Sequence, residues 1–167
     1  NRSAFSVNVW YRHTSFASFG AVIAQYFGGN YYWPSGGNSD IGMCIGNITG
    51  ASNVVSAGIW NRNAGTWAST ATVTQVVDTW YNYTMTFSGG AGTITFYCNN
   101  VSIGAAAVSG TITQPSPVNP IAVTRNYNSG GATVYPGKLG ALQIYDVELT
   151  STQVTQNWNH FKTRYGY

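Results

Sequence analysis

The sequence predicts an all-β fold, an antiparallel sandwich of two sheets with a short C-terminal α-helix. Three observations lead to that prediction. Short segments in which apolar and polar residues alternate recur along the chain, with turn signals between them. Two of these segments flank a glycine-rich turn, as the strands of a hairpin do. Convincing helical periodicity is confined to the segment after residue 150.

The central hairpin is predicted at residues 80–87 and 93–98, where large apolar side chains alternate with Thr and Asn. A glycine-rich turn joins the two strands. Asn99 and Asn100 follow as a predicted type I′ turn, because Asn tolerates positive φ better than other non-glycine residues.

Further strands are predicted by alternation and by β-branched or aromatic content. The first has an aromatic side chain on each face, Tyr11 on one and Trp10 on the other, so we expect it inside a sheet and not at a free edge. The predicted segments are residues 5–12, 21–26, 41–46, 54–60, 70–77 and 139–149.

The region after the hairpin is predicted to be less regular. Residues 105–119 contain Pro and Gly and predict an irregular connection with at most a short strand at 110–113. In the last strand, the spacing of Leu139, Leu142 and Ile144 requires a β-bulge if all three are to point inward.

The C-terminal helix has a clear start signal. Thr150 and Gln153 are spaced as a capping box, and Leu149 and Val154 occupy the staple positions around it. One apolar face then recurs at helical spacing and is expected to dock on the sandwich, formed by Val154, Trp158 and Phe161.

Three segments carry a family resemblance: TWYNYT at 79–84 with FYCNNV at 96–101, FSVNVWYR at 5–12, and the closing stretch 137–151. Taken in their order along the chain, they resemble laminin-G-like domains of the concanavalin A-like superfamily. Residues 120–125 resemble a further strand of these domains. Residues 149–166 are similar to the ends of such domains in phage and other viral structural proteins. The resemblance implies a jelly-roll fold covering residues 1–167 as a single domain. It also implies an upstream strand that is missing here or belongs to a longer protein.

Composition limits the partners. Charged residues make up 7% of the chain, against a typical ~25%, and the net charge of +3 comes from scattered Lys and Arg without a basic run. Nucleic acid is therefore not an expected partner, and the chain contains no apolar run long enough for insertion into a membrane. The neutral polar composition and the resemblance together predict an extracellular or virion-surface location. Cys44 and Cys98 are predicted to be separate thiols.

Catalysis is not expected, because the chain has only four carboxylates. Asp146 and Glu148 are the one close pair, and on a strand they would lie roughly 7 Å apart. They fall at the variable tail of the family pattern, however, and the glycosidase strand motif is absent. The histidines, His13 and His160, are interpreted as surface or capping residues.

No residue cluster has the spacing of a metal site, so we expect no tightly bound metal and no cofactor. Asp40 or Asp78 with neighbouring Asn residues could supply at most a weak calcium site.

The remaining chemistry suits recognition of neutral glycans, for which aromatic rings pair with the apolar faces of sugars and neutral side chains with hydroxyls. Aromatic residues make up 15% of the chain, so many must be core. The resemblance implies a structural role for Trp10 and Trp80. The candidate ligand-binding residues form three groups: Asn30, Tyr31, Tyr32, Trp33 and Asn38; Trp60 and Trp67 with Asn61 and Asn63; and Tyr127 with Asn126 and Asn128.

The predicted function is a non-enzymatic recognition or adhesion module of a virion or secreted assembly, binding glycans. Two alternatives stay open. One is a structural subunit that binds its own kind, since an aromatic loop can equally pack against a neighbouring subunit and form a homo-oligomer. The other is a glycan-degrading enzyme.

Overall fold

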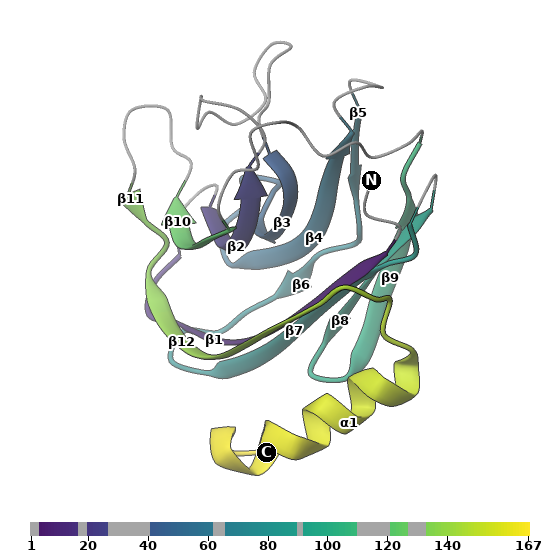
Figure 1. The fold of residues 1–167 in the computed structure, drawn as a ribbon. Coiled ribbons are helices and arrows are strands. Elements are labelled where there is room, and N and C mark those ends of the chain that lie inside the picture. Colours follow the sequence, from purple (N-terminus) through teal and green to yellow (C-terminus); the bar gives the residue numbers. More distant parts are fainter. Residues whose placement is uncertain are drawn as a thin grey trace.

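A computed structural model describes residues 4–16, 20–26, 41–61, 66–89, 92–109, 121–126 and 133–167. Two antiparallel β-sheets face each other, and a C-terminal helix lies beneath one of them (Figure 1). The predicted sandwich with a C-terminal helix is confirmed.

The first sheet has five strands in the order β12-β1-β7-β8-β9. β1 lies between two neighbours, as its aromatic side chains on both faces predicted. The strands are β1 (Phe5–His13), β7 (Trp80–Phe87), β8 (Thr93–Cys98), β9 (Val101–Ala107) and β12 (Gly137–Tyr145).

The second sheet has the order β11-β10-β2-β3-β4-β5, and the two-residue strand β6 also pairs with β4. Its strands are β2 (Gly20–Tyr26), β3 (Ile41–Asn47), β4 (Val54–Asn61), β5 (Thr66–Ser69), β6 (Val73–Thr74), β10 (Ile121–Asn126) and β11 (Thr133–Val134). Four of them lie close to the predicted segments.

The core lies between the two sheets, because each sheet turns alternate side chains toward the other. In the first sheet these are the aliphatic and aromatic positions of the predicted hairpin and first strand. The largest fully buried core side chains are Tyr11, Tyr83, Tyr135, Phe87, Phe96, Ile23, Ile45, Ile59 and Met85.

The turn between β8 and β9 confirms the predicted type I′ conformation. Asn99 and Asn100 have φ of 50° and 66°, the left-handed region that this turn requires at both central positions. The side-chain oxygen of Asn99 also accepts a hydrogen bond of 2.9 Å from the backbone N–H of Asn82, which ties the turn to β7.

Helix α1 (Ser151–Phe161) begins as predicted. The Gln153 N–H donates to Thr150 Oγ1 at 3.3 Å, and the Thr150 N–H donates to Gln153 Oε1 at 2.9 Å, so the capping box is formed. Leu149 and Val154, the staple residues, are both buried. A short 3₁₀-helix, η1 (Lys162–Tyr165), continues from the end of α1.

The helix covers the outer face of the first sheet (Figure 1). Trp158 of α1 stacks on Trp10 of β1 with ring centroids 5.1 Å apart, and Tyr165 of η1 stacks on the same indole at 4.4 Å. Ser6 fixes the chain just ahead of the helix, since its Oγ accepts from the Leu149 N–H at 2.8 Å and donates to the Val147 carbonyl at 2.9 Å.

Three strand predictions were wrong in part, one of them because β12 ends at Tyr145 and not at residue 149. Of residues 70–77, only Val73–Thr74 is strand, and the preceding strand is Thr66–Ser69 instead. A composition rich in Thr and Val favours extended backbone but does not supply a pairing partner. Ala105, Ala106 and Ala107, predicted to be irregular, continue β9 because they pair with β8.

The expected bulge in β12 is present, and it lies between the partners of Val9 and Tyr11. Leu139, Leu142 and Ile144 then pair with core-facing residues of β1. Only Leu142 packs on the core; Leu139 and Ile144 stay 44% and 43% exposed. The reason is that β12 is an edge strand of its sheet.

Candidate functional site

The structure describes one side chain among the predicted ligand-binding residues, Trp67. Trp60, Asn61 and Asn126 are described in their backbone. The other predicted residues lie outside the described part of the chain: Asn30, Tyr31, Tyr32, Trp33, Asn38 and Tyr127, together with Asn63 and Asn128.

The strand register nevertheless places the three predicted groups relative to the second sheet. Tyr26 pairs with Ile41, and Asn61 pairs with Thr66. Since β3 pairs antiparallel with β4, these two pairs lie at the same end of the sheet. Residues 27–40 and 62–65 therefore leave from one end, which we call the Trp67 end.

The third group starts from the other end. Asn126 pairs with Gly20, the first residue of β2, and Gly20 pairs with Asn47, the last residue of β3. The segment that contains Tyr127 follows Asn126 directly. Residues 27–40 and 62–65 thus join the sheet at one end, and residues 127–132 join it at the other.

Trp67 is held on the outer face of the second sheet. It lies opposite Trp60 in the β4–β5 pair, and its half-buried side chain packs against a small cluster that includes Ile48 and Cys44. The indole lies directly over Gly58: a Cβ atom at that position would be 2.5 Å from Cζ2 of Trp67. The absence of a side chain at Gly58 lets the ring lie against the strand.

The surface beneath the ring is built from small residues. One cross-strand row runs over the outer face of five strands and consists of Ala122, Ala24, Cys44, Gly58 and Ser69. Cys44 is fully buried in this row, and burial raises the pKa of its thiol, so it stays protonated and unreactive. Cys98 faces the core from the other sheet, and both cysteines are free, as predicted.

The described residues at the strand ends of the Trp67 end carry no charge. They are Gln25, Tyr26, Ile41, Asn61, Thr66 and Ile121. Thr66 is exposed, and its hydroxyl lies 3.1 Å from that of Ser109. Among the described residues at this end, an aromatic ring and neutral hydroxyl groups are suited to a neutral polar ligand.

His13 is not a surface residue, so that interpretation was wrong. Its side chain is fully buried, and Nε2 lies 2.8 Å from the hydroxyl of Tyr83. Burial lowers the pKa of His13 to about 4, which keeps the ring neutral at physiological pH. Tyr11 and Tyr135 pack edge-on against the ring. His160 is exposed on α1, as expected.

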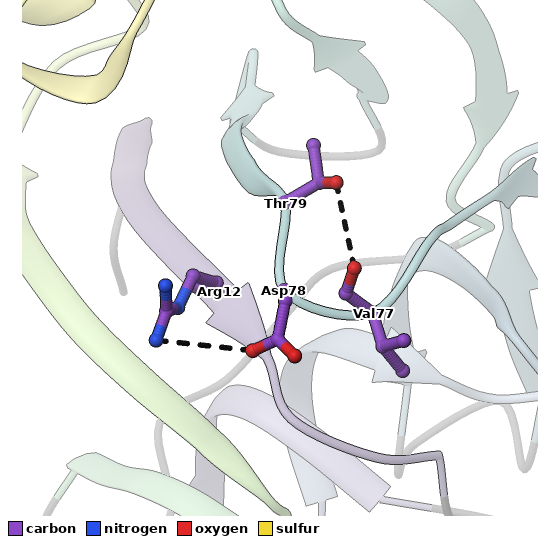
Figure 2. A network of polar contacts seen from close by, with 4 residues as sticks. All are labelled: Arg12, Val77, Asp78 and Thr79. Carbon is purple, nitrogen blue, oxygen red and sulfur yellow. Dashed lines mark hydrogen bonds and ion pairs between the residues drawn. The ribbon is translucent and has the colours of Figure 1, made fainter.

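The carboxylates that the structure describes are not paired on a strand face. Asp146 and Glu148 follow the last residue of β12 and are exposed, so they do not share a strand face as expected. Asp78 lies in a turn with φ of 59°, and its side chain lies 3.8 Å from that of Arg12 (Figure 2). Within the described ranges, no three His, Cys, Asp or Glu side chains are grouped so that they could hold a metal ion.

Two features of the described residues carry no local sequence signal. His13 follows an alternating strand, but its burial depends on packing against Tyr83 and Tyr135, which are distant in sequence. Arg12 and Lys138 become neighbours only through the β1–β12 register.

No helix within the described ranges has the length and apolar character to cross a membrane.

A family model described as the concanavalin A-like lectin/glucanases superfamily matches residues 1–155. No curated protein matches the sequence. Among solved structures, the receptor-binding domain of botulinum neurotoxin type G is similar with a TM-score of 0.65 and 16% identity over 95% of this chain. The chain spans 38% of the length of that protein.

Two further solved structures share the fold. A heptameric SAP-like pentraxin from Limulus polyphemus has a TM-score of 0.60 and 18% identity, over 92% of this chain and 68% of the other. Domain 4 of AbnA, an extracellular arabinanase from Geobacillus stearothermophilus in complex with arabinotriose, has a TM-score of 0.62 and 16% identity, over 92% and 66%.

Proposed function

Since this chain belongs to the concanavalin A-like lectin/glucanases superfamily, we propose that it is a recognition module that binds neutral glycans at the Trp67 end of the second sheet. The proposed site combines Trp67 and Trp60 with Asn30, Tyr31, Tyr32, Trp33 and Asn38.

One observation carries the proposal: the strand ends that residues 27–40 connect lie at the same end of the sheet as Trp60 and Trp67. Sugar rings bind to proteins through their apolar faces, so neighbouring aromatic side chains can hold successive residues of a saccharide. Trp67 supports this role because its indole is fixed against Gly58 and Ile48 while part of it stays accessible. A ligand that meets a fixed ring loses less entropy in ordering it.

The module is proposed to be non-enzymatic. The described carboxylates are Asp78, Asp146 and Glu148, and none of them lies in the second sheet, at whose Trp67 end the site is proposed. Glycoside hydrolysis needs an acid and a second carboxylate across the bound sugar. The complex of the arabinanase domain with arabinotriose supports saccharide binding on this fold.

We further propose that residues 1–167 act as a single domain on a virion or in a secreted assembly, at an extracellular or virion surface. The support is compositional: only 7% of residues are charged, and neutral hydrogen-bonding residues take their place. The proposed virion location is supported by the similarity of residues 149–166 to the ends of domains in viral structural proteins.

A structural subunit that binds its own kind is the second candidate. Edge strand β12 favours it, because Leu139 and Ile144 are 44% and 43% exposed and Val147, just beyond the strand, is 50% exposed. Exposed apolar edge strands pair readily with other chains. A mass measurement in solution separates the two: a monomer that binds glycans supports the recognition module, and an oligomer without glycan binding supports the subunit.

The proposal is tested by binding of the purified domain to a broad glycan array, with and without calcium, beside a Tyr32→Ala/Trp33→Ala variant. We expect binding that does not require calcium and is lost in the variant. A wild-type domain that binds no glycan under either condition would remove the proposal.

A further inference from the structure

A second surface with different chemistry lies on the outer face of the first sheet, near the end of η1. Arg12 of β1 pairs directly with Lys138 of β12 on one side and with Trp80 of β7 on the other. Residues opposite each other in antiparallel strands point to the same face, with Cβ atoms about 5 Å apart. Lys138, Arg12 and Trp80 therefore form one row across three strands.

Aromatic rings extend this row toward the C-terminal segment. The Arg12 guanidinium lies 5.9 Å from the ring centroid of Trp80, and Trp80 lies 4.7 Å from the ring of Tyr165. The guanidinium of Arg164 lies 5.8 Å from the Tyr165 ring. We call Arg12, Trp80, Lys138, Arg164 and Tyr165 the basic aromatic patch.

The positive charge of the patch is poorly balanced. Asp78 lies 3.8 Å from Arg12, beyond hydrogen-bond distance, and its side chain is 67% exposed against 28% for Arg12 (Figure 2). Neither Lys138 nor Arg164 forms an ion pair with any residue in the described ranges. Like charges directly opposite each other across two strands, as in Arg12 and Lys138, destabilise the pair.

Arg12 also has unused donor capacity. Among the described residues its Nε atom, which is buried, has no hydrogen-bond partner, and Asp78 approaches only one terminal nitrogen and not in the bidentate geometry that arginine favours. A bound anion beside the accessible part of the Arg12 side chain would meet its terminal donors and relieve the repulsion from Lys138. The patch thus has the charge and the donors of an anion site, next to aromatic rings.

We propose that the basic aromatic patch binds an acidic saccharide, with its sulfate or carboxylate group between Arg12 and Lys138 and a sugar ring against the half-buried Trp80. The site lies on the other sheet from the proposed neutral-glycan site and does not depend on it. A saccharide fits better than a lipid bilayer, because Trp80 is half-buried and Tyr165 is buried, which leaves no ring free to insert. Nucleic acid fits poorly, since the chain carries a net charge of only +3.

The test measures calorimetric binding of a heparin-derived octasaccharide, with inorganic sulfate and phosphatidylserine vesicles as separate arms. The main variant is Lys138→Gln/Arg164→Gln, since both side chains are exposed and their loss should leave the fold intact. The charge-conserving Lys138→Arg/Arg164→Lys variant and Arg125→Gln, on β10 of the other sheet, are the controls.

We expect wild type to bind the octasaccharide, and the main variant to lose about tenfold or more in affinity. Both controls should stay within about twofold of wild type, and binding should weaken with added salt. The main variant should keep its affinity for any neutral glycan, whereas Trp67→Ala should keep its affinity for the octasaccharide.

Three results would overturn the proposal. One is an octasaccharide affinity that does not differ between wild type and the main variant. Another is equal loss in Arg125→Gln, which would mean that only net charge matters. The third is binding to vesicles or free sulfate without binding to the octasaccharide, which would assign the patch to a lipid headgroup or a small anion.

Discussion

The imidazole Nε2 of His13 lies 2.8 Å from the hydroxyl of Tyr83, with both side chains fully buried between the sheets. The two residues are 70 positions apart in sequence and lie on the adjacent strands β1 and β7 of the first sheet. Burial lowers the pKa of His13 to about 4 and raises that of Tyr83. Both groups are therefore neutral over the physiological range, and the fold is adapted to a neutral imidazole at this position.

Stability should fall in mild acid. The unfolded chain protonates His13 below about pH 6.5, whereas the folded chain does so only near pH 4. Between these values the unfolded state binds more protons, so the free energy of unfolding decreases as the pH falls. We expect the free energy of unfolding to fall by an amount on the order of 3 kcal/mol between pH 7 and pH 4. Urea unfolding across this pH range measures it.

The matched control is His13→Gln, which removes the titrating group. Its free energy of unfolding should be lower than that of wild type at pH 7 and should depend less on pH. His160→Gln, at an exposed position on α1, is the second histidine variant to compare. A wild-type slope that survives in His13→Gln would attribute the acid sensitivity to other groups.

Docking of α1 should depend on the aromatic stack around Trp10. Trp158→Ala removes a ring that stacks on Trp10 at an interplanar angle of 12°, and we expect a loss of about 2–3 kcal/mol in unfolding free energy. Near-ultraviolet circular dichroism should lose signal from the stacked indoles. His160→Ala, on an exposed position of the same helix, should change neither measurement; equal effects of the two substitutions would refute the role of the stack.

Gly58→Ala should displace Trp67. The added methyl group would meet Cζ2 of Trp67 at 2.5 Å and Cδ1 of Ile48 at 2.9 Å, so the ring must move, at a cost of about 1–3 kcal/mol. Because the ring is displaced, both the free energy of unfolding and the glycan affinity should fall. Ser56→Ala, a buried position of the same strand whose hydroxyl has no hydrogen-bond partner, should leave both unchanged. Unaltered glycan binding in Gly58→Ala would mean that Trp67 does not contact the ligand.

Thr150→Ala should weaken the start of α1. The substitution removes the hydroxyl that accepts from the Gln153 N–H, and such caps contribute about 1 kcal/mol. Thr150→Ser keeps the hydroxyl and should stay close to wild type in thermal unfolding. If the two variants unfold alike, the capping hydrogen bond does not stabilise the protein.

Local signals were sufficient for several elements. The Asn99–Asn100 turn and the Thr150 capping box depend on residues adjacent in sequence, so their patterns predicted the observed geometry. The residues at 70–77 lacked such a signal. Their strand content is decided by pairing with β4, which composition does not specify.

Less of the site could be predicted. The sequence identified Trp67 as an aromatic candidate, but its position over Gly58 depends on the β4–β5 register. The burial of His13 depends on Tyr83 and Tyr135, and the Arg12–Lys138 pair on strands from opposite ends of the chain. Such contacts are set by tertiary pairing and have no local pattern.

The central claim is that two aromatic groups at the Trp67 end form one glycan site. The most direct measurement is calorimetric affinity for the best array saccharide in wild type, Trp33→Ala, Trp67→Ala and Tyr127→Ala. We predict that the first two substitutions each weaken binding by about tenfold or more, since a lost stacking ring costs roughly 1–3 kcal/mol. Tyr127→Ala should bind like wild type, because its segment leaves from the opposite end of the sheet. Loss of binding in Tyr127→Ala with wild-type affinity in the other two would contradict the account.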